Sequence, residues 1–508
     1  MTRLRLSALL LGLALLPARP ALAQGTIVYS VKVTSPATHY AEIEATFPTE
    51  GRAAIVLMMP VWSPGFYRVE DYAAKVEELN ARPASGGPPL SVGKPKPNRW
   101  RIQTEGASAV VVTYRLRCDG RSVTTNAVAP NLLVLNPGAA LMTLADGHDR
   151  PHEVRLDLPS GFQPAKSGLD SVNGEDNRFL APDYDTLVDS PMVAGDLSVR
   201  EFVVEGVKHQ VVDAGRHEEW NGEAGARDLR KIARGTLDYW GVLPYKRYVF
   251  MSVFRPGGGG LEHGNSTLVT SSPQMKAPNL GWLSFMAHEY FHSMNVKRLR
   301  PVELGPFDYE KPPATSSLWI AEGLTTYGAN LVLARMFLCT VPEYLGLLSG
   351  SIDELQNSPG RRKQTLEEAS LDVWNSGTSG VGRDTKNVLS YYAKGPVVGF
   401  LLDAKIQRAT RGRKSLQHVM RLAYERYGGA RGFTAEEFQK TAEEVANIDL
   451  GGAFHSWLRS TDELDYKEAL DWFGLRFAPK TWQLVVRADP SDAQRTRLRT
   501  WLGRDTGK

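Results

Sequence analysis

H-E-Y-F-H, residues 288 to 292, is the stretch that decides the architecture of this chain of 508 residues. It lies inside a helical pattern that runs from Leu283 to Val296. A helix places residues four positions apart on one face, so the imidazoles of His288 and His292 can reach one zinc ion. Glu289 lies about one hundred degrees further round the helix, beside the metal rather than on it. There its carboxylate can accept a proton from an attacking water, which predicts a zinc site with Glu289 as the general base.

A catalytic zinc site needs a third protein ligand from elsewhere in the fold, and W-I-A-E-G (319 to 323) supplies the best candidate. Glu322 stands in an otherwise apolar helix, where an unpaired buried carboxylate is costly unless it meets a cation. Gly323 costs about 1 kcal/mol relative to Ala in a helix, which suggests close packing against the H-E-x-x-H helix. A plain salt bridge from Glu322 to a lysine or arginine is the alternative explanation.

The first two dozen residues have the pattern of a secretory signal peptide. Basic residues precede an apolar run from Leu6 to Leu16, and the small-residue site A-L-A (21 to 23) follows. The run stops at Pro17, well short of the about 20 apolar residues that cross a bilayer, so we expect cleavage before Gln24. No later apolar run is long enough to span. The sequence therefore predicts a secreted or periplasmic protein with no membrane anchor after signal cleavage.

The composition is that of an ordinary globular protein, with 42% hydrophobic and 23% charged residues. Three arginines of the predicted signal peptide account for three of the four positive charges in the formal net charge of +4, which leaves +1 for the mature chain. A charge so close to zero gives no indication of nucleic acid or an anionic membrane as a partner. Cys118 and Cys339 fall in different predicted domains, so we expect packing rather than a disulfide to stabilise the chain.

The apolar patterns divide the chain after the signal peptide, residues 1–23, into further parts. Short alternating runs broken by Pro and Gly predict an antiparallel β-sandwich over residues 24–200. Strand-like runs at 201 to 212 and 247 to 254 surround a helix expected over 227 to 240, which predicts a mixed sheet and helices over residues 201–345. Helical periods dominate residues 346–477, where Thr434 and Glu437 have capping-box spacing. A short tail, 478–508, ends the chain.

Together these motifs resemble the glycyl aminopeptidases of the gluzincin group, secreted or periplasmic enzymes that usually carry a C-terminal PDZ domain. The resemblance covers about residues 26 to 477. It rests on V-W-S-P-G-F-Y (61 to 67), G-G-G-G-L-E-H (257 to 263), H-E-Y-F-H-S-M-N-V-K-R-L-R-P (288 to 301), L-W-I-A-E-G-L-T-T-Y (318 to 327) and Y-Y-A-K-G (391 to 395).

The resemblance implies a thermolysin-like α+β zinc peptidase domain at 201–345, followed by a C-terminal helical domain that carries a catalytic tyrosine. It also implies one zinc per chain, held by His288, His292 and Glu322. The expected activity is the release of Gly or Ala from peptides with a free N-terminus.

Further site residues follow from the resemblance alone. Glu262 would bind the α-ammonium of the substrate, and Tyr392 would donate a hydrogen bond to the developing oxyanion. Gly259 and Gly260 would let the backbone approach the substrate closely. Without the resemblance, the glycine run would be interpreted as a flexible turn and Tyr391-Tyr392 as core aromatics.

The sequence also departs from the pattern of the family. Met294 stands where members often carry Trp, and Gly328 where a second Tyr is common, so we expect a different pocket wall. Too few residues remain after Leu475 for a PDZ domain, which needs about 80 to 90. We therefore expect that domain to be missing and a basic helical segment, Asp492 to Leu502, to end the chain.

A basic cluster, Lys297, Arg298 and Arg300, follows the metal helix directly. Three cations at the C-terminal end of a helix are usually solvated partners of its dipole, which is the interpretation we favour. Binding of a substrate carboxylate is the alternative.

Two other functions compete with the aminopeptidase hypothesis. One is a zinc endopeptidase, and the other is a catalytically silent peptide-binding protein on a peptidase scaffold. The candidate ligands, base, amine-binding residue and tyrosine are all present together, and a scaffold without turnover would need none of them. The sequence therefore favours an active aminopeptidase.

Overall fold

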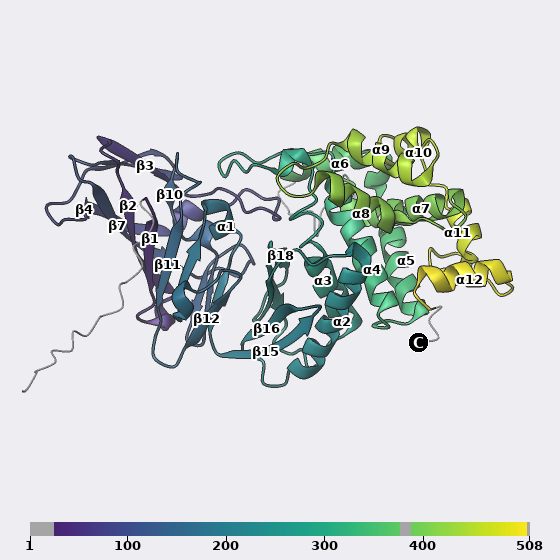
Figure 1. Cartoon of the computed structure of the whole chain (residues 1–508), viewed down its shortest axis with the longest axis horizontal. Helices are drawn as coiled ribbons and strands as arrows, with labels where there is room; N and C mark the ends of the chain where they lie inside the picture. The colour runs from purple at the N-terminus through teal and green to yellow at the C-terminus, as the bar shows by residue number, and fades with distance from the viewer. Residues whose placement is uncertain (1–24, 376–387, 505–508) are drawn as a thin grey trace, which may run out of the picture.

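The computed structural model describes residues 25–375 and 388–504 of the chain. The predicted signal peptide, residues 1–23, lies outside the described residues. Figure 1 shows the parts of the chain in sequence order along the long axis: sheets in the N-terminal part (purple and blue), a mixed part (teal) and helices (green and yellow). This order confirms the predicted succession of a β-rich, a mixed and a helical part.

The N-terminal part consists of strands in which buried and exposed residues alternate, as in β1 and β2. One sheet has the order β13 (Arg178–Ala181), β11 (His152–Asp157), β1 (Ile27–Lys32), β2 (Tyr40–Pro48), β7 (Ala109–Arg117) and β4 (Val76–Pro83). Another has the order β10 (Thr143–Leu144), β3 (Ala54–Met58), β6 (Arg99–Gln103) and β5 (Val92–Lys96). The predicted sandwich is not purely antiparallel, because β11 returns after a long connection to pair in parallel with β1.

A further sheet joins this part to the middle of the molecule. Its order is β12 (Gln163–Ser167), β14 (Met192–Gly195), β9 (Leu132–Leu135) and β8 (Ala127–Ala129). A buried cluster that includes Val134, Val193, Met251 and Leu268 packs it against the mixed sheet of the middle part. An apolar interface therefore attaches the N-terminal part to the middle part.

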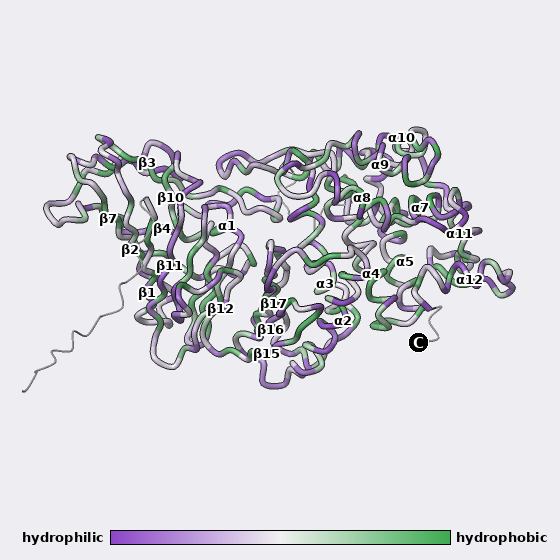
Figure 2. The backbone as a smooth tube through the Cα atoms, viewed as in Figure 1, coloured by the Kyte–Doolittle hydropathy of each residue, from purple (hydrophilic) through white to green (hydrophobic). Residues whose placement is uncertain are grey.

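The mixed sheet of the middle part has the order β15 (Leu197–Val204), β16 (Val207–Gly215), β17 (Arg247–Phe254), β19 (Ser266–Ser271) and β18 (Gly260–Glu262). The strand predicted at 201 to 212 is instead a hairpin, because Glu205 and Gly206 both have positive φ and form its turn. This turn is the hydrophilic loop at the lower edge of Figure 2. The edge strand β18 ends at Glu262.

Helices α2 (Gly222–Trp240) and α3 (Leu280–Phe291) pack against this sheet. The predicted start of α2 is too late, because the Asn221 side chain caps the helix by accepting a hydrogen bond from the Ala224 amide. The H-E-x-x-H helix also begins and ends earlier than predicted. Asn279 caps its first turn and His292 is its C-terminal cap.

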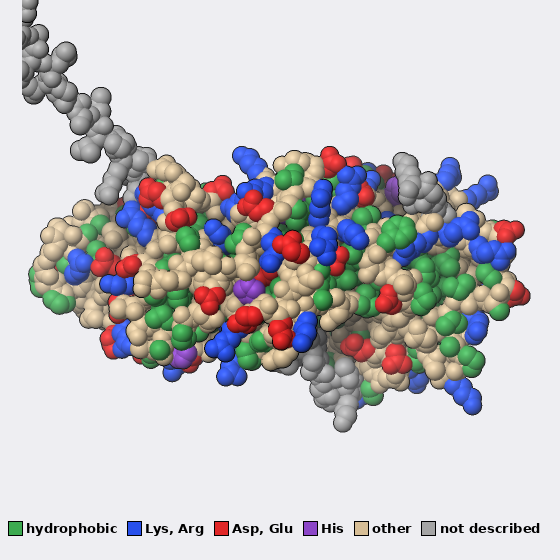
Figure 3. Space-filling model, turned by 90° about the horizontal axis from the view of Figure 1, so that it is seen from below, with side chains coloured by type: hydrophobic (Ala, Val, Ile, Leu, Met, Phe, Trp, Pro, Cys, Tyr) green, Lys and Arg blue, Asp and Glu red, His purple; other side chains and the backbone are tan. Residues whose placement is uncertain are grey.

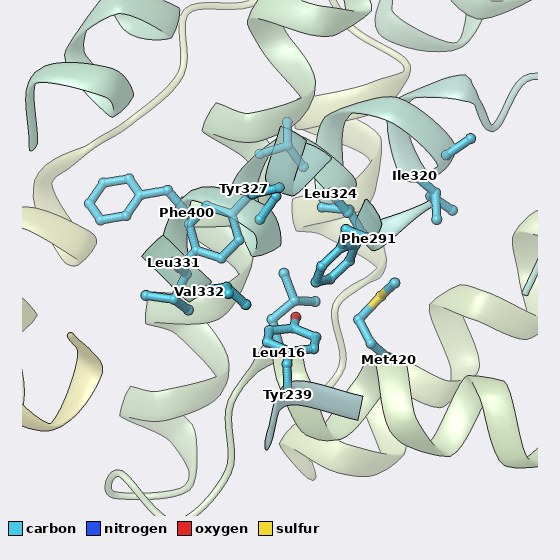
Figure 4. Packing of buried hydrophobic residues seen from close by; sticks show 14 of the residues in the cluster. Tyr239, Phe291, Ile320, Leu324, Tyr327, Leu331, Val332, Phe400, Leu416 and Met420 are labelled. Carbon is cyan, nitrogen blue, oxygen red and sulfur yellow. The ribbon is translucent and has the colours of Figure 1, made fainter. Parts of the chain in front are cut away.

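The helical part is built from α4 (Thr325–Arg335), α5 (Val341–Asn357), α6 (Leu366–Leu371), α7 (Tyr391–Ala409), α8 (Leu416–Tyr427), α9 (Ala435–Ala446), α10 (Gly451–Leu458) and α11 (Lys467–Phe473). The predicted capping box of Thr434 and Glu437 is confirmed. Figure 4 shows Tyr239, Phe291, Leu331 and Leu416 packed into one core, so α2, α3, α4 and α8 are held together by apolar contacts.

A π-helix, Trp319–Leu324, precedes α4. The prediction that Gly323 packs against the H-E-x-x-H helix is wrong. A Cβ at Gly323 would lie 2.5 Å from the Cα of Gly395, and one at Gly395 would lie 2.7 Å from the Cα of Gly323. The two glycines therefore let the π-helix and α7 touch backbone to backbone, three residues from Tyr392.

The tail forms the hairpin β20 (Leu475–Phe477) and β21 (Leu484–Val486) and the helix α12 (Asp492–Trp501), so the predicted helix is confirmed. Trp501 is buried, stacks on Phe473 with ring centroids 4.1 Å apart, and donates a hydrogen bond to the Tyr327 hydroxyl. The tail is thus part of the helical core.

Within residues 25–375 and 388–504, none of the helices is long and apolar enough to cross a membrane. The face in Figure 3 carries acidic and basic side chains side by side. Cys118 and Cys339 are buried free cysteines.

The glycine contact generates a prediction about stability. We expect Gly395→Ala to destabilise the protein by about 1 to 3 kcal/mol, because the added methyl must push α7 away from the π-helix. Gly346→Ala is the matched control, since a Cβ at Gly346 in α5 meets nothing within 4 Å. Thermal unfolding measures both. Equal stability of the two variants would contradict the proposed close contact.

Candidate metal centre

Three potential ligand atoms meet where α3 faces the π-helix. The Nε2 atoms of His288 and His292 are 2.9 Å apart, and Glu322 Oε2 lies 3.4 Å from the first and 3.2 Å from the second. A tetrahedral metal bound at about 2.0 to 2.1 Å separates its ligands by about 3.3 Å. The three atoms therefore already have the spacing of one face of a tetrahedral site.

The hydrogen bonds behind these ligands fix where their protons lie. His292 Nδ1 lies 2.7 Å from the Asn295 carbonyl oxygen, which can only accept, so Nδ1 carries the proton. The Thr326 hydroxyl donates to the Glu322 carbonyl and therefore accepts from His288 Nδ1, at 3.1 Å. With Nδ1 protonated on both rings, the two Nε2 atoms are the ones that can ligate a metal, and both point at a carboxylate oxygen. Such an arrangement needs a positive charge between the three atoms, which either a metal ion or a proton on His292 Nε2 supplies.

The electrostatics of the site also favour a cation. Burial penalises a charge on His292, yet Glu322 and Glu262 raise its pKa to about 10. Burial likewise opposes ionisation of Glu322, but His292 and His288 hold its pKa well below the usual range. The two imidazoles and the carboxylate, together with the negative charge of the surrounding glutamates, thus fit a divalent metal ion held by His288, His292 and Glu322.

Glu289 lies beside the ligands and is buried. Its Oε2 has no hydrogen-bond partner among the described residues. Burial raises the pKa of Glu289 well above the usual value. A Cβ at Gly260 would lie 2.4 Å from Glu289 Oε1, so the absence of a side chain at Gly260 makes the room that Glu289 occupies. Gly259 has a left-handed φ of +108° and faces Val123 of the N-terminal part.

Glu262, at the end of β18, is also buried, and its Oε1 has no partner within the part of the chain that the structure describes. A Cβ at Gly65 would lie 2.3 Å from this oxygen, so the backbone of the N-terminal part covers the carboxylate directly. Burial raises the pKa of Tyr67, and Glu322 and Glu262 raise it further, so this side chain lies close to both carboxylates. Gly65 and Tyr67 both lie in the motif at 61 to 67, and neither is among the site residues predicted from the sequence.

Tyr392 stands in the first turn of α7, with its ring centroid 6.3 Å from that of His288. Burial, followed by the charge of Glu322, raises its pKa well above the usual value, so the hydroxyl stays protonated. Tyr391 is fully buried behind it, with the ring centroids 4.8 Å apart. Of the two tyrosines, Tyr392 is the one whose ring neighbours a candidate ligand.

The basic cluster after the metal helix is not solvated, which corrects the prediction. Lys297 Nζ lies 2.6 Å from Asp189 Oδ1, and its side chain is only 10% exposed. Arg298 donates to the carbonyls of Gly264 and Ser293, both at 2.6 Å. Arg300 donates to the carbonyls of Leu304 and Ala430. The reason is that the chain turns back into the domain interface after His292 instead of ending its helix at the surface.

The two departures from the family pattern lie in the packing of the core. Met294 is fully buried in the main core cluster. A Cβ at Gly328 would lie 2.5 Å from the ring of Phe291, so a tyrosine would not fit there unless α3 and α4 separated. The expected change of a pocket wall at these positions is therefore wrong for both.

Two domain families match the sequence. Residues 28–196 match the N-terminal domain of peptidase family M61, and residues 281–398 match the M61 glycyl aminopeptidase domain. A comparison with curated proteins found no match.

Solved structures with a similar fold include an aminopeptidase N family protein from Idiomarina loihiensis, 26% identical, with a TM-score of 0.83 over 88% of this chain and 78% of that chain. An M1 zinc metallopeptidase from Deinococcus radiodurans is 12% identical, with a TM-score of 0.53 over 87% of this chain and 95% of the other. Native yeast LTA4 hydrolase is 14% identical, with a TM-score of 0.54 over 86% of this chain and 68% of the other. The family matches and the shared fold confirm the predicted fold class and support a metallopeptidase.

The proton assignment at His288 generates a prediction. Thr326→Val removes the acceptor that orients this imidazole and should weaken metal binding about 10- to 100-fold. Thr326→Ser keeps the hydroxyl and is the matched control. Competition between each variant and a chelator for Zn²⁺ or Co²⁺ gives the affinities. Unchanged affinity in Thr326→Val would mean that His288 is not oriented by this hydrogen bond.

Proposed function

The chain belongs to the M61 peptidase family, and we propose that it is a zinc-dependent aminopeptidase that releases small residues, Gly or Ala, from the free N-terminus of peptides. One observation carries the proposal. Besides Glu322 and Glu289, the site has a third buried carboxylate, Glu262 on the edge strand β18, and its Oε1 has no partner among the described residues. A buried carboxylate in that position needs a cationic partner, and the α-ammonium of a peptide is one.

In this proposal His288, His292 and Glu322 hold one zinc ion per chain. The zinc, when bound, supplies Lewis acidity, which polarises the scissile carbonyl and makes a water more acidic. Glu289 takes a proton from the attacking water as the new C–O bond forms. It then delivers that proton to the amine nitrogen as the C–N bond breaks. The Tyr392 hydroxyl donates a hydrogen bond to the developing oxyanion, which its protonated state allows.

Glu262 decides which peptide bond is cleaved. An ion pair between its carboxylate and the α-ammonium fixes the first residue of the substrate, so the first peptide bond lies over the metal ligands. Gly260 leaves the substrate backbone free to run along the edge of β18. Gly65 and Tyr67 lie beside Glu262 and so border the place of the first residue of the substrate. The preference for a small first side chain is proposed from the match to the glycyl aminopeptidase domain.

The proposed substrates are therefore peptides with a free N-terminus. The signal-peptide pattern at residues 1–23 supports the proposal that the enzyme acts outside the cytoplasm, in the periplasm or the medium.

The test compares two peptides that differ only in N-terminal acetylation. Acetylation removes the cation and leaves Glu262 opposite a neutral amide, which should lower kcat/KM of the wild type by about 10² to 10³. Glu262→Gln should lose activity on the free peptide. It should also narrow the ratio of kcat/KM for the free peptide to that for the acetylated peptide, because the variant no longer has a carboxylate that the acetylated substrate would leave unpaired. The comparison is a double-mutant cycle with one change made in the substrate.

Glu289→Gln is the matched control for this cycle. As the general base it acts on both peptides, so its substitution should lower both rates and leave their ratio unchanged. Two results would favour the endopeptidase hypothesis over the aminopeptidase. One is that the wild type cleaves acetylated peptides as fast as free ones, and the other is that the effects of acetylation and of Glu262→Gln on kcat/KM are additive. Binding of free peptides without any turnover would instead indicate a silent peptide-binding protein.

A further inference from the structure

A partly buried ion pair connects the N-terminal part to the residues beside Glu262. Asp189 follows α1 (Tyr184–Val188) in the N-terminal part, and its Oδ1 lies 2.6 Å from Lys297 Nζ. The same oxygen lies 3.1 Å from His263 Nδ1, and Oδ2 accepts a hydrogen bond of 2.7 Å from the Gly264 amide. The Asp189 carboxylate therefore binds two segments: Lys297 in the chain after the metal helix, and the turn at His263 and Gly264 that directly follows Glu262.

The strength of this contact is indicated by its effect on ionisation. Burial opposes a charge on Asp189, yet Lys297 and the hydrogen bond from His263 lower its pKa to about 2. Burial raises the pKa of Glu262, while the charge of Lys297 is among those that lower it. Lys297 therefore interacts electrostatically with both carboxylates and supports the ionised form of each.

The surroundings explain why an ion pair is needed here. Asp189, Lys297 and Glu262 all line one cavity of about 720 Å³ between the N-terminal and catalytic parts, and Gly65 and Tyr67 line it as well. A cavity leaves Glu262 without dense side-chain packing on that side. The polar contacts of Asp189 and the backbone of Gly65 are then what hold the end of β18 in place.

We propose that Asp189 and Lys297 are positioning residues for Glu262, so that the N-terminal part takes a direct share in recognising the amine of the substrate. The proposal rests on the function proposed above. Neither residue touches the reacting atoms. Asp189 fixes the turn at His263 and Gly264, Lys297 holds the Asp189 carboxylate in place, and Glu262 is thereby held at the distance from the metal ligands that places the first peptide bond correctly. A small displacement of such a group lowers the rate strongly, because the reacting atoms lose their alignment.

The experiment measures the ratio of kcat/KM for a free peptide to that for its N-acetylated form in the full-length zinc-loaded enzyme. Asp189→Asn and Lys297→Met should each lower this ratio by about 10- to 100-fold, through loss of the free-peptide activity. Lys297→Arg keeps the charge and should restore most of the ratio. Zinc content should stay at the wild-type value in all of them, since no metal ligand is changed.

Glu310→Gln is the matched control. Glu310 accepts hydrogen bonds from Asn98 and Arg99, so it also forms an ion pair that reaches the N-terminal part, and its side chain is 20% exposed compared with 27% for Asp189. Among the described residues it forms no hydrogen bond or ion pair with Glu262 or its turn, so Glu310→Gln should leave the ratio unchanged. If a single variant fails to fold, Asp189→Asn combined with Lys297→Met leaves neither charge unpaired and should give the same loss of the ratio.

The outcomes separate this proposal from the proposed function. A wild type that does not distinguish free from acetylated peptides overturns the aminopeptidase itself. A wild type that does distinguish them, with an unchanged ratio in Asp189→Asn and Lys297→Met, overturns only the positioning role. An equal fall of the ratio in Glu310→Gln would also overturn it, because any loosening of the domain interface would then have the same effect.

Discussion

Two imidazole nitrogens and one carboxylate oxygen are held within 3.4 Å of one another with their lone pairs converging. This arrangement is unfavourable in the absence of a cation, and the protein maintains it with hydrogen bonds from behind. The Asn295 carbonyl and the Thr326 hydroxyl fix the tautomers of His292 and His288. The close contact of Gly323 with Gly395 lets the π-helix that bears Glu322 and the helix that bears Tyr392 approach the same point. Much of the architecture of the helical part can be understood as support for that convergence.

The N-terminal part is more than a cover for this centre. Its Gly65 backbone lies against the Glu262 carboxylate, and its Asp189 binds the turn after Glu262. An apolar interface between the two sheets supplies the general attachment. Polar contacts cross this interface at several places, for example from Arg247 to the carbonyls of Ser167 and Leu169 and from Glu310 to Arg99. The contacts of Asp189 differ from these because they hold the turn directly after Glu262, where a change of about 1 Å would matter most for the position of a substrate.

The sequence contains most of the local information about the site. His288, His292 and Glu289 are predictable because helical periodicity dictates their geometry, and Glu322 because a carboxylate in an apolar helix needs a cation. Glu262 and Tyr392 could be chosen only by resemblance, since their positions depend on the tertiary structure. The partner of Gly323, the burial of Lys297 and the docking of Trp501 were not predictable, because each depends on a segment distant in the chain. The hairpin at Glu205 and Gly206 was missed although its turn chemistry was visible in the sequence.

Metal analysis of the purified protein, with and without a chelator, tests the central claim most directly. The account predicts about one zinc per chain, loss of peptidase activity when the zinc is removed, and recovery when it is returned. It also predicts that Glu289→Gln keeps its zinc while turnover falls by about 10² to 10⁴, because Glu289 is the base and not a ligand. A protein that binds no metal and hydrolyses peptides unaffected by chelator would contradict the account, and so would a Glu289→Gln variant that has lost its zinc.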